Sequence, residues 1–188
     1  MDKYDRDEII RLTEEYGGAW GIHHTQRLLH LMVEIGEGLT YDAEIVWLAA
    51  HLHDWGAYAR WAQPNVDHCL RSCEVANTFL TERGFQDEVT ARVLECIELH
   101  HTAGSDRCLE SVLLRDAYAL DFLGVVGVLR NFSMNPREMR RAYDETRRRQ
   151  DKMMGVIFLE KAKAIAADRD RAMRDLLRQF ETETSGCF

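Results

Sequence analysis

Histidine and aspartate stand beside apolar segments at several separate places in this sequence. The clearest case is His53-Asp54, which follows the apolar segment 45–52. A buried imidazole or carboxylate is costly unless it is paired, protonated or bound to a metal ion. Adjacent residues project in different directions from a regular helix, so both could reach one ion only near a helix end. The Trp55-Gly56 pair that follows is consistent with such an end.

Similar residues lie in three other segments. His23-His24 opens one apolar stretch, His100-His101 closes another, and Asp116 lies among the apolar residues of 113–117. Facing helices of a bundle can bring such side chains to one shared site. Histidine nitrogen with carboxylate oxygen suits a divalent Mn, Fe, Ni, Co or Mg ion better than a thiolate-bound structural zinc. The sequence therefore predicts a catalytic site with such an ion.

The elements that position these residues are predicted to be helices, because apolar residues recur at spacings of three and four. The sequence has only two prolines and 12 glycines, which favours long helices joined by short turns. We expect Gly17-Gly18 to end the first helix and Thr40 or Asp42 to cap the third. We expect helices over 6–16, 22–37, 43–55, 67–83, 87–101 and 110–132, then one or two long helices from Asn135-Pro136 to about Glu183.

The expected fold class is therefore all-α, a single-domain helical bundle. No repeat or linker divides the chain, so we expect one domain over 1–188, with a metal-site core at about 16–132 and C-terminal helices at about 135–184. The third expected helix is apolar almost all round, which is typical of the centre of a bundle. The long C-terminal helices could also form a homodimer.

Composition and charge argue against several classes of function and location. Hydrophobic residues make up 46% and charged residues 30%, as in soluble globular proteins. The formal charge of −8 argues against nucleic-acid binding, and we interpret the arginine-rich segment 137–149 as a solvated helix face. No stretch approaches the roughly 18 apolar residues of a membrane span, and the polar N-terminus is not a secretory signal.

The five cysteines include no Cys-x-x-Cys pair, so we expect reduced thiols and a cytoplasmic protein. Cys69 and Cys73 are four residues apart and could share one helix face. We interpret them as buried thiols rather than as metal ligands.

The ordered set of these residues resembles the HD superfamily of metal-dependent phosphohydrolases, over roughly residues 16–132. The resemblance rests on three motifs, which are His24-x-x-Arg27-Leu28, His53-Asp54, and Asp116-Ala117 followed by Leu120-Asp121 and Gly124. The remaining helices are similar to those of small stand-alone bacterial members.

Two positions depart from the family pattern. Tyr118 replaces an aspartate of close relatives, and Ala57 replaces a glutamate of the nucleotidase-like branch, which argues against a simple deoxynucleotide monophosphatase.

The resemblance implies a ligand set for the principal metal, namely His24, His53, Asp54 and Asp116. It places His100 beside the site, where it would contact phosphate or a second metal, and His101 competes for that role. His68 matches an additional ligand of binuclear members. Arg27 and Arg115 are candidates for binding substrate phosphate, although Arg27 could instead pair with Asp121 or with a metal-bound carboxylate. His30 and His51 are expected to be structural.

The implied activity is metal-assisted hydrolysis of a phosphate ester or anhydride in a nucleotide or other small phosphorylated metabolite. Asp54 would orient or deprotonate the attacking water, and His100 would protonate the leaving oxygen or hydrogen-bond the phosphate. Two alternatives stay open. One is a catalytically silent, metal-containing ligand-binding or sensor domain, and the other is a di-iron oxygenase on the same scaffold.

Overall fold

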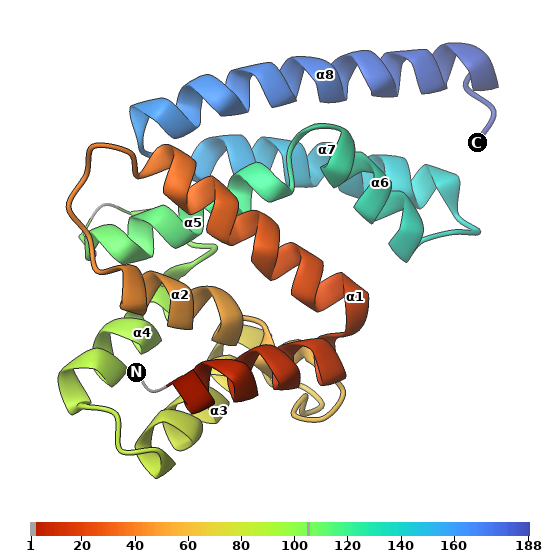
Figure 1. The fold of residues 1–188 in the computed structure, drawn as a ribbon. Coiled ribbons are helices and arrows are strands. Elements are labelled where there is room, and N and C mark those ends of the chain that lie inside the picture. The colour runs from red at the N-terminus through yellow and green to blue at the C-terminus, as the bar shows by residue number, and fades with distance from the viewer. Residues whose placement is uncertain (1–2, 105) are drawn as a thin grey trace. The chain divides into compact units, whose positions relative to one another are not determined.

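The computed structural model describes residues 3–104 and 106–188, which form eight α-helices, one short 3-10 turn and no strand (Figure 1). The all-α expectation is confirmed. The chain divides into two compact units, Met1–Arg115 and Asp116–Phe188, and the boundary lies inside one helix. The expectation of a single domain stays a prediction. Each helix within the described residues is too short or too polar to cross a membrane.

The first unit contains the helices that surround the predicted site. Its elements are α1 (Lys3–Ile35), α2 (Ala43–Leu52), the 3-10 turn η1 (Trp55–Ala57), α3 (His68–Glu82), α4 (Asp87–Leu99) and the beginning of α5 (Leu109–Asp121). Helix α1 has a kink at Gly18, where φ is 59° and ψ is −166°. The predicted break at Gly17-Gly18 is therefore confirmed, although no loop separates the two halves.

Helix α2 occupies the centre of this unit, because it packs against both α1 and α4. Asp42 caps it, and its carboxylate accepts the main-chain N–H groups of Glu44 at 2.9 Å and Ile45 at 3.3 Å. Seven of its ten residues are buried. The predictions of the cap and of a central apolar helix are confirmed. Since α2 ends at Leu52, His53 and Asp54 lie at the helix end rather than within it.

The chain after Asp54 lies directly against α3. Gly56 donates its main-chain N–H to the hydroxyl of Ser72 at 2.8 Å. A β-carbon at position 56 would stand 2.3 Å from the main-chain nitrogen of Ser72 and 2.5 Å from the carbonyl oxygen of His68. Only glycine fits this contact, which holds the end of α2 beside the start of α3.

The second unit consists of the end of α5 with α6 (Gly124–Met134), α7 (Met139–Val156) and α8 (Glu160–Thr184). Helix α6 packs against both α7 and α8. Apolar side chains of the last two helices, such as Ala142, Met153, Met173 and Leu177, are buried within the unit.

Two predictions about this region are wrong. The helix expected over 110–132 is two helices, because Gly124 has a φ of +75°, a left-handed conformation that ends the regular helix. Asn135-Pro136 does not start the next helix, which begins at Met139. Instead, Asn135 closes α6 by donating its main-chain N–H to the carbonyl of Phe132 at 3.2 Å.

Candidate metal centre

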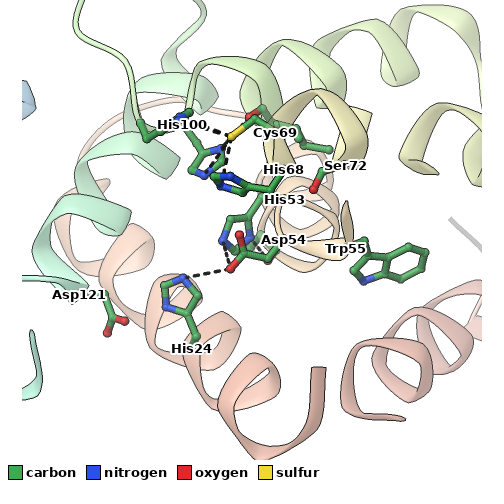
Figure 2. Close-up of polar contacts among 12 residues, drawn as sticks. His24, His53, Asp54, Trp55, His68, Cys69, Ser72, His100 and Asp121 are labelled. Carbon is green, nitrogen blue, oxygen red and sulfur yellow. Dashed lines mark hydrogen bonds and ion pairs between the residues drawn. The ribbon is translucent and has the colours of Figure 1, made fainter. Parts of the chain in front are cut away.

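Three residues converge at the end of α2. His53 and Asp54 are adjacent in the sequence, and His24 is distant from them. Oδ2 of Asp54 lies 3.3 Å from Nε2 of His53 and 3.9 Å from Nε2 of His24, a residue of α1 (Figure 2). One ligand atom of each residue lies within 4.8 Å of the others. Both histidines are buried, whereas the Asp54 side chain keeps 24% of its surface exposed. The first three residues of the predicted ligand set therefore come together.

The rings of His53 and His100 are held in an orientation suited to metal ligation. Nδ1 of His53 lies 2.9 Å from the carbonyl oxygen of Ala50. Because a carbonyl only accepts hydrogen bonds, Nδ1 carries a proton, and in the neutral ring Nε2 is left with a lone pair. His100 is held in the same way, with Nδ1 2.6 Å from the carbonyl oxygen of Ile97. Metal-binding histidines are characteristically oriented by such a hydrogen bond at the other ring nitrogen.

The electrostatics of the cluster favour an anionic carboxylate and a neutral imidazole. Burial opposes the ionisation of Asp54, but the facing rings of His53, His24 and His100 outweigh this cost and hold the pKa of Asp54 below its usual range. Burial lowers the pKa of His100 well below its usual value. At neutral pH the site therefore presents the Asp54 carboxylate beside the neutral ring of His100.

His68 and His100 extend the cluster. Asp54, His68 and His100 also offer ligand atoms within 4.8 Å of one another. The ring centre of His100 is 5.1 Å from that of His53 and 5.9 Å from that of His68. These nitrogen and oxygen donors fit one divalent ion at His24, His53 and Asp54, and they fit a second at Asp54, His68 and His100.

His101 does not take the place of His100. Its ring faces the thiol of Cys69, with Nδ1 3.5 Å from Sγ. Cys69 is buried, as predicted, but sequence reasoning missed its position among histidines. The adjacency of His68 and Cys69 in the sequence was the available signal.

Asp116 belongs to the second unit, where it is buried. Its carboxylate accepts the main-chain N–H groups of Phe158 at 3.1 Å and Leu159 at 2.7 Å, so it stabilises the turn between α7 and α8. Metal ligation by Asp116 stays a prediction.

The two candidate phosphate-binding arginines differ in their surroundings. Arg27 is half-buried on α1, one turn after His24. Arg115 is fully buried and donates to the carbonyl of Gly104 at 2.5 Å, which favours a structural role. Asp121, the alternative partner of Arg27, forms a buried ion pair with Arg130.

The histidines expected to be structural lie outside the ligand groups that the described residues form. His51 is buried, its ring centre lies 3.9 Å from that of Trp47 in a tilted arrangement, and its Nδ1 is 2.9 Å from the Trp47 carbonyl oxygen. His30 and His23 are exposed on α1.

Comparison with known proteins places this cluster in a family. The family model of the HD domain matches residues 21–123. A predicted HD superfamily hydrolase from an uncultured Thermotogales bacterium is 26% identical, with a TM-score of 0.67 over 94% of this chain and 91% of the other. YpgQ of Bacillus subtilis, solved in complex with ADP, is 25% identical, with a TM-score of 0.73 over 96% and 95% of the two chains.

An HD-superfamily hydrolase from Bacillus thuringiensis shares the fold at 19% identity, with a TM-score of 0.73 over 97% of this chain and 96% of the other. None of the curated proteins compared with the chain matches it. The family model covers more than half of the sequence, and the converging His24, His53 and Asp54 lie within its bounds. The fold and its hydrolase neighbours support a metal-dependent hydrolase, and the chain belongs to the HD-domain family.

Proposed function

We propose that this protein is a metal-dependent phosphohydrolase that acts on a nucleotide or another small phosphorylated metabolite. The convergence of His24, His53 and Asp54 at one buried point carries the proposal. The complex of YpgQ with ADP supports the substrate class, because a protein similar over nearly the whole chain holds a molecule with a phosphoric anhydride.

His24, His53 and Asp54 would hold the ion, and His68 and His100 would hold a second one. When bound, a divalent ion lowers the pKa of a water molecule and offsets the charge that develops on a phosphoryl group. The rings are already oriented for this purpose by the carbonyl groups of Ala50 and Ile97.

Asp54 has the position and charge for the role of base. Its carboxylate is ionised, and its partial exposure lets a water molecule reach it. A carboxylate in hydrogen-bond reach of the nucleophilic water orients it and accepts its proton.

His100 is better suited to binding a metal ion than to donating a proton. The ring is neutral, and its proton is engaged at Nδ1 by the Ile97 carbonyl group. Nε2 therefore offers a lone pair rather than a proton. Of the roles that the resemblance implies, contact with a second metal fits this state best.

The experiment is a hydrolysis panel on the purified chain. Elemental analysis first identifies the bound metal, and release of phosphate or pyrophosphate is then measured from nucleotides and other phosphorylated metabolites with added Mn, Co, Ni or Mg. Asp54→Ala is compared with His30→Ala, which changes an exposed histidine of α1. We expect Asp54→Ala to reduce turnover roughly 100-fold or more and His30→Ala to leave it unchanged.

Three outcomes would overturn the proposal. Equal activity in Asp54→Ala would assign the turnover to a contaminant. Binding of phosphorylated compounds without turnover under any metal would identify a sensor domain. Bound iron together with oxygen consumption would identify an oxygenase.

A further inference from the structure

A group of ligand-type side chains distinct from the His24, His53 and Asp54 cluster lies where α3 begins and α4 ends. Sγ of Cys69 is 3.3 Å from Nε2 of His68 and 3.5 Å from Nδ1 of His101. One ligand atom from each of these residues lies within 4.8 Å of the others. Figure 2 shows the thiol of Cys69 directed at the rings of His68 and His100, and Sγ lies 3.8 Å from Nδ1 of His100. The group contains sulfur, which none of His24, His53 and Asp54 provides.

The distances match those of a metal-bound set. With Zn–S near 2.3 Å and Zn–N near 2.0–2.1 Å, a tetrahedral ion holds its sulfur and nitrogen ligands about 3.5 Å apart. The two observed separations, 3.3 Å and 3.5 Å, lie close to this value. An ion could therefore enter with little movement of the side chains.

Asp67 lies beside both His68 and Cys69. Nδ1 of His68 lies 3.8 Å from Oδ2 of Asp67, while the other carboxylate oxygen of Asp67 accepts the main-chain N–H of Cys69 at 2.9 Å. A carboxylate beside the far nitrogen of a histidine is a common second layer of metal sites. Asp67 thus fixes the main chain of Cys69 by a hydrogen bond and places a negative charge near the far nitrogen of His68.

The three residues differ in how far their side chains are exposed to solvent. Cys69 is buried, with 3% of its surface exposed, whereas His68 and His101 are half-buried. An ion can approach past the two rings, and protein atoms cover the sulfur behind them.

A reactive thiol is a poorer interpretation of Cys69. Burial, together with the nearby Asp67 and Asp54 carboxylates, raises the pKa of the thiol above its usual value. A thiol that keeps its proton is a weak nucleophile, whereas a bound cation displaces that proton to solvent.

We propose that His68, Cys69 and His101 form a metal site that binds a thiophilic divalent ion such as Zn²⁺ through one sulfur and two nitrogens. A three-ligand set of this kind leaves the fourth position of a tetrahedral ion open to water or to a ligand. The site lies beside the His24, His53 and Asp54 cluster, and it does not rest on the proposed phosphohydrolase function. It shares His68 with the Asp54, His68 and His100 group, which has only nitrogen and oxygen donors, so an ion bound by Cys69 and His101 competes with that group for His68.

The test is a spectroscopic titration of the metal-free, full-length chain with Co²⁺. Thiolate coordination gives a sulfur-to-cobalt charge-transfer band in the near ultraviolet, which nitrogen and oxygen ligands do not produce. We expect the band in the wild type, its loss in Cys69→Ser, and its retention in Cys73→Ser. Cys73 is the matched control because it lies one turn further along α3 and is half-buried. Zn²⁺ added afterwards should displace Co²⁺ and remove the band.

Two more variants keep the test decisive. His101→Ala should weaken Co²⁺ binding at least about tenfold, which also tests the proposal should Cys69→Ser fail to fold. Asp54→Asn should retain the band, since Asp54 belongs to the other cluster. A wild type without the band, a band that persists in Cys69→Ser, or a band lost in Asp54→Asn would overturn the site. An inactive wild type that shows the band would count against the hydrolase alone.

Discussion

His53 and Asp54 are neighbours in the sequence, yet Nε2 of the first and Oδ2 of the second face each other at 3.3 Å. Within a regular helix, consecutive side chains point about 100° apart. These two converge because α2 ends at Leu52 and the chain turns into η1 at Trp55. The ability of this residue pair to act on one ion therefore depends on the helix end.

Replacing His53 with glutamine should remove one nitrogen donor from the cluster. We expect bound metal to fall below one equivalent and phosphohydrolase activity to drop roughly 100-fold, as measured by elemental analysis and phosphate release. His51→Gln is the control, because His51 lies two residues earlier and outside the ligand groups of the described residues. Equal metal content in both variants would contradict the assignment of His53.

Stability should depend on pH through His51. Burial lowers the pKa of His51 to about 4, whereas an unfolded chain titrates near 6.5. The unfolded state binds the proton first as the pH falls, so the free energy of unfolding declines below about pH 6.5, by about 2 kcal/mol at pH 5. Urea unfolding at pH 7 and pH 5 measures this loss. His51→Gln should show a smaller decline, and an identical decline would assign the effect to other groups.

The buried hydroxyl of Thr13 should contribute measurably to stability. It accepts the indole N–H of Trp55 at 3.0 Å and donates to the carbonyl of Ile9 at 2.8 Å. Thr13→Val preserves the shape but removes the acceptor, so we expect a loss of about 1–3 kcal/mol in urea unfolding. Thr13→Ser keeps the hydroxyl and should lose less. A valine variant as stable as the serine variant would refute this hydrogen bond.

The ion pair of Asp121 with Arg130 should be important to the second unit. Both side chains are buried, and the guanidinium of Arg130 lies 4.2 Å from the ring centre of Phe122. Asp121→Asn removes one charge of the pair, which we expect to cost about 3 kcal/mol. The double variant Asp121→Asn, Arg130→Met should recover part of this loss in thermal unfolding. No recovery would show that the two residues act independently.

Local sequence signals predicted much of the fold and of the cluster. Asp42 identified the start of α2, and Gly17-Gly18 identified the kink of α1. His53-Asp54 was recognisable because a polar pair after an apolar helix needs a partner.

The failures concern properties that local sequence does not carry. Gly124 lies in a run of small residues that looks helical, and only its positive φ reveals the break. Asn135-Pro136 has the composition of a helix start, but Asn135 is used to close the preceding helix. The position of Cys69 beside His101 depends on how α3 packs against α4, which a pattern along one segment cannot show.

Gly56→Ala should separate α3 from the end of α2. The added methyl group would meet main-chain atoms of Ser72 and His68, which cannot rotate away as a side chain would. We expect a lower unfolding temperature and weaker binding of the second metal ion, measured by thermal unfolding and Co²⁺ titration. Gly155→Ala is the control, since no atom lies within 4 Å of its β-carbon position. Equal effects of the two changes would refute the role of Gly56.

The same contact at Gly56 has a consequence for how such proteins diversify. Its spacing is fixed by main-chain atoms of residues 56, 68 and 72 and by the hydroxyl of Ser72, not by the side chains that would bind ions. A substitution at position 69 would therefore change the donor atom offered to the proposed site while the frame that holds the donors keeps its dimensions. A lineage could change its preferred metal in single steps without first rebuilding the scaffold.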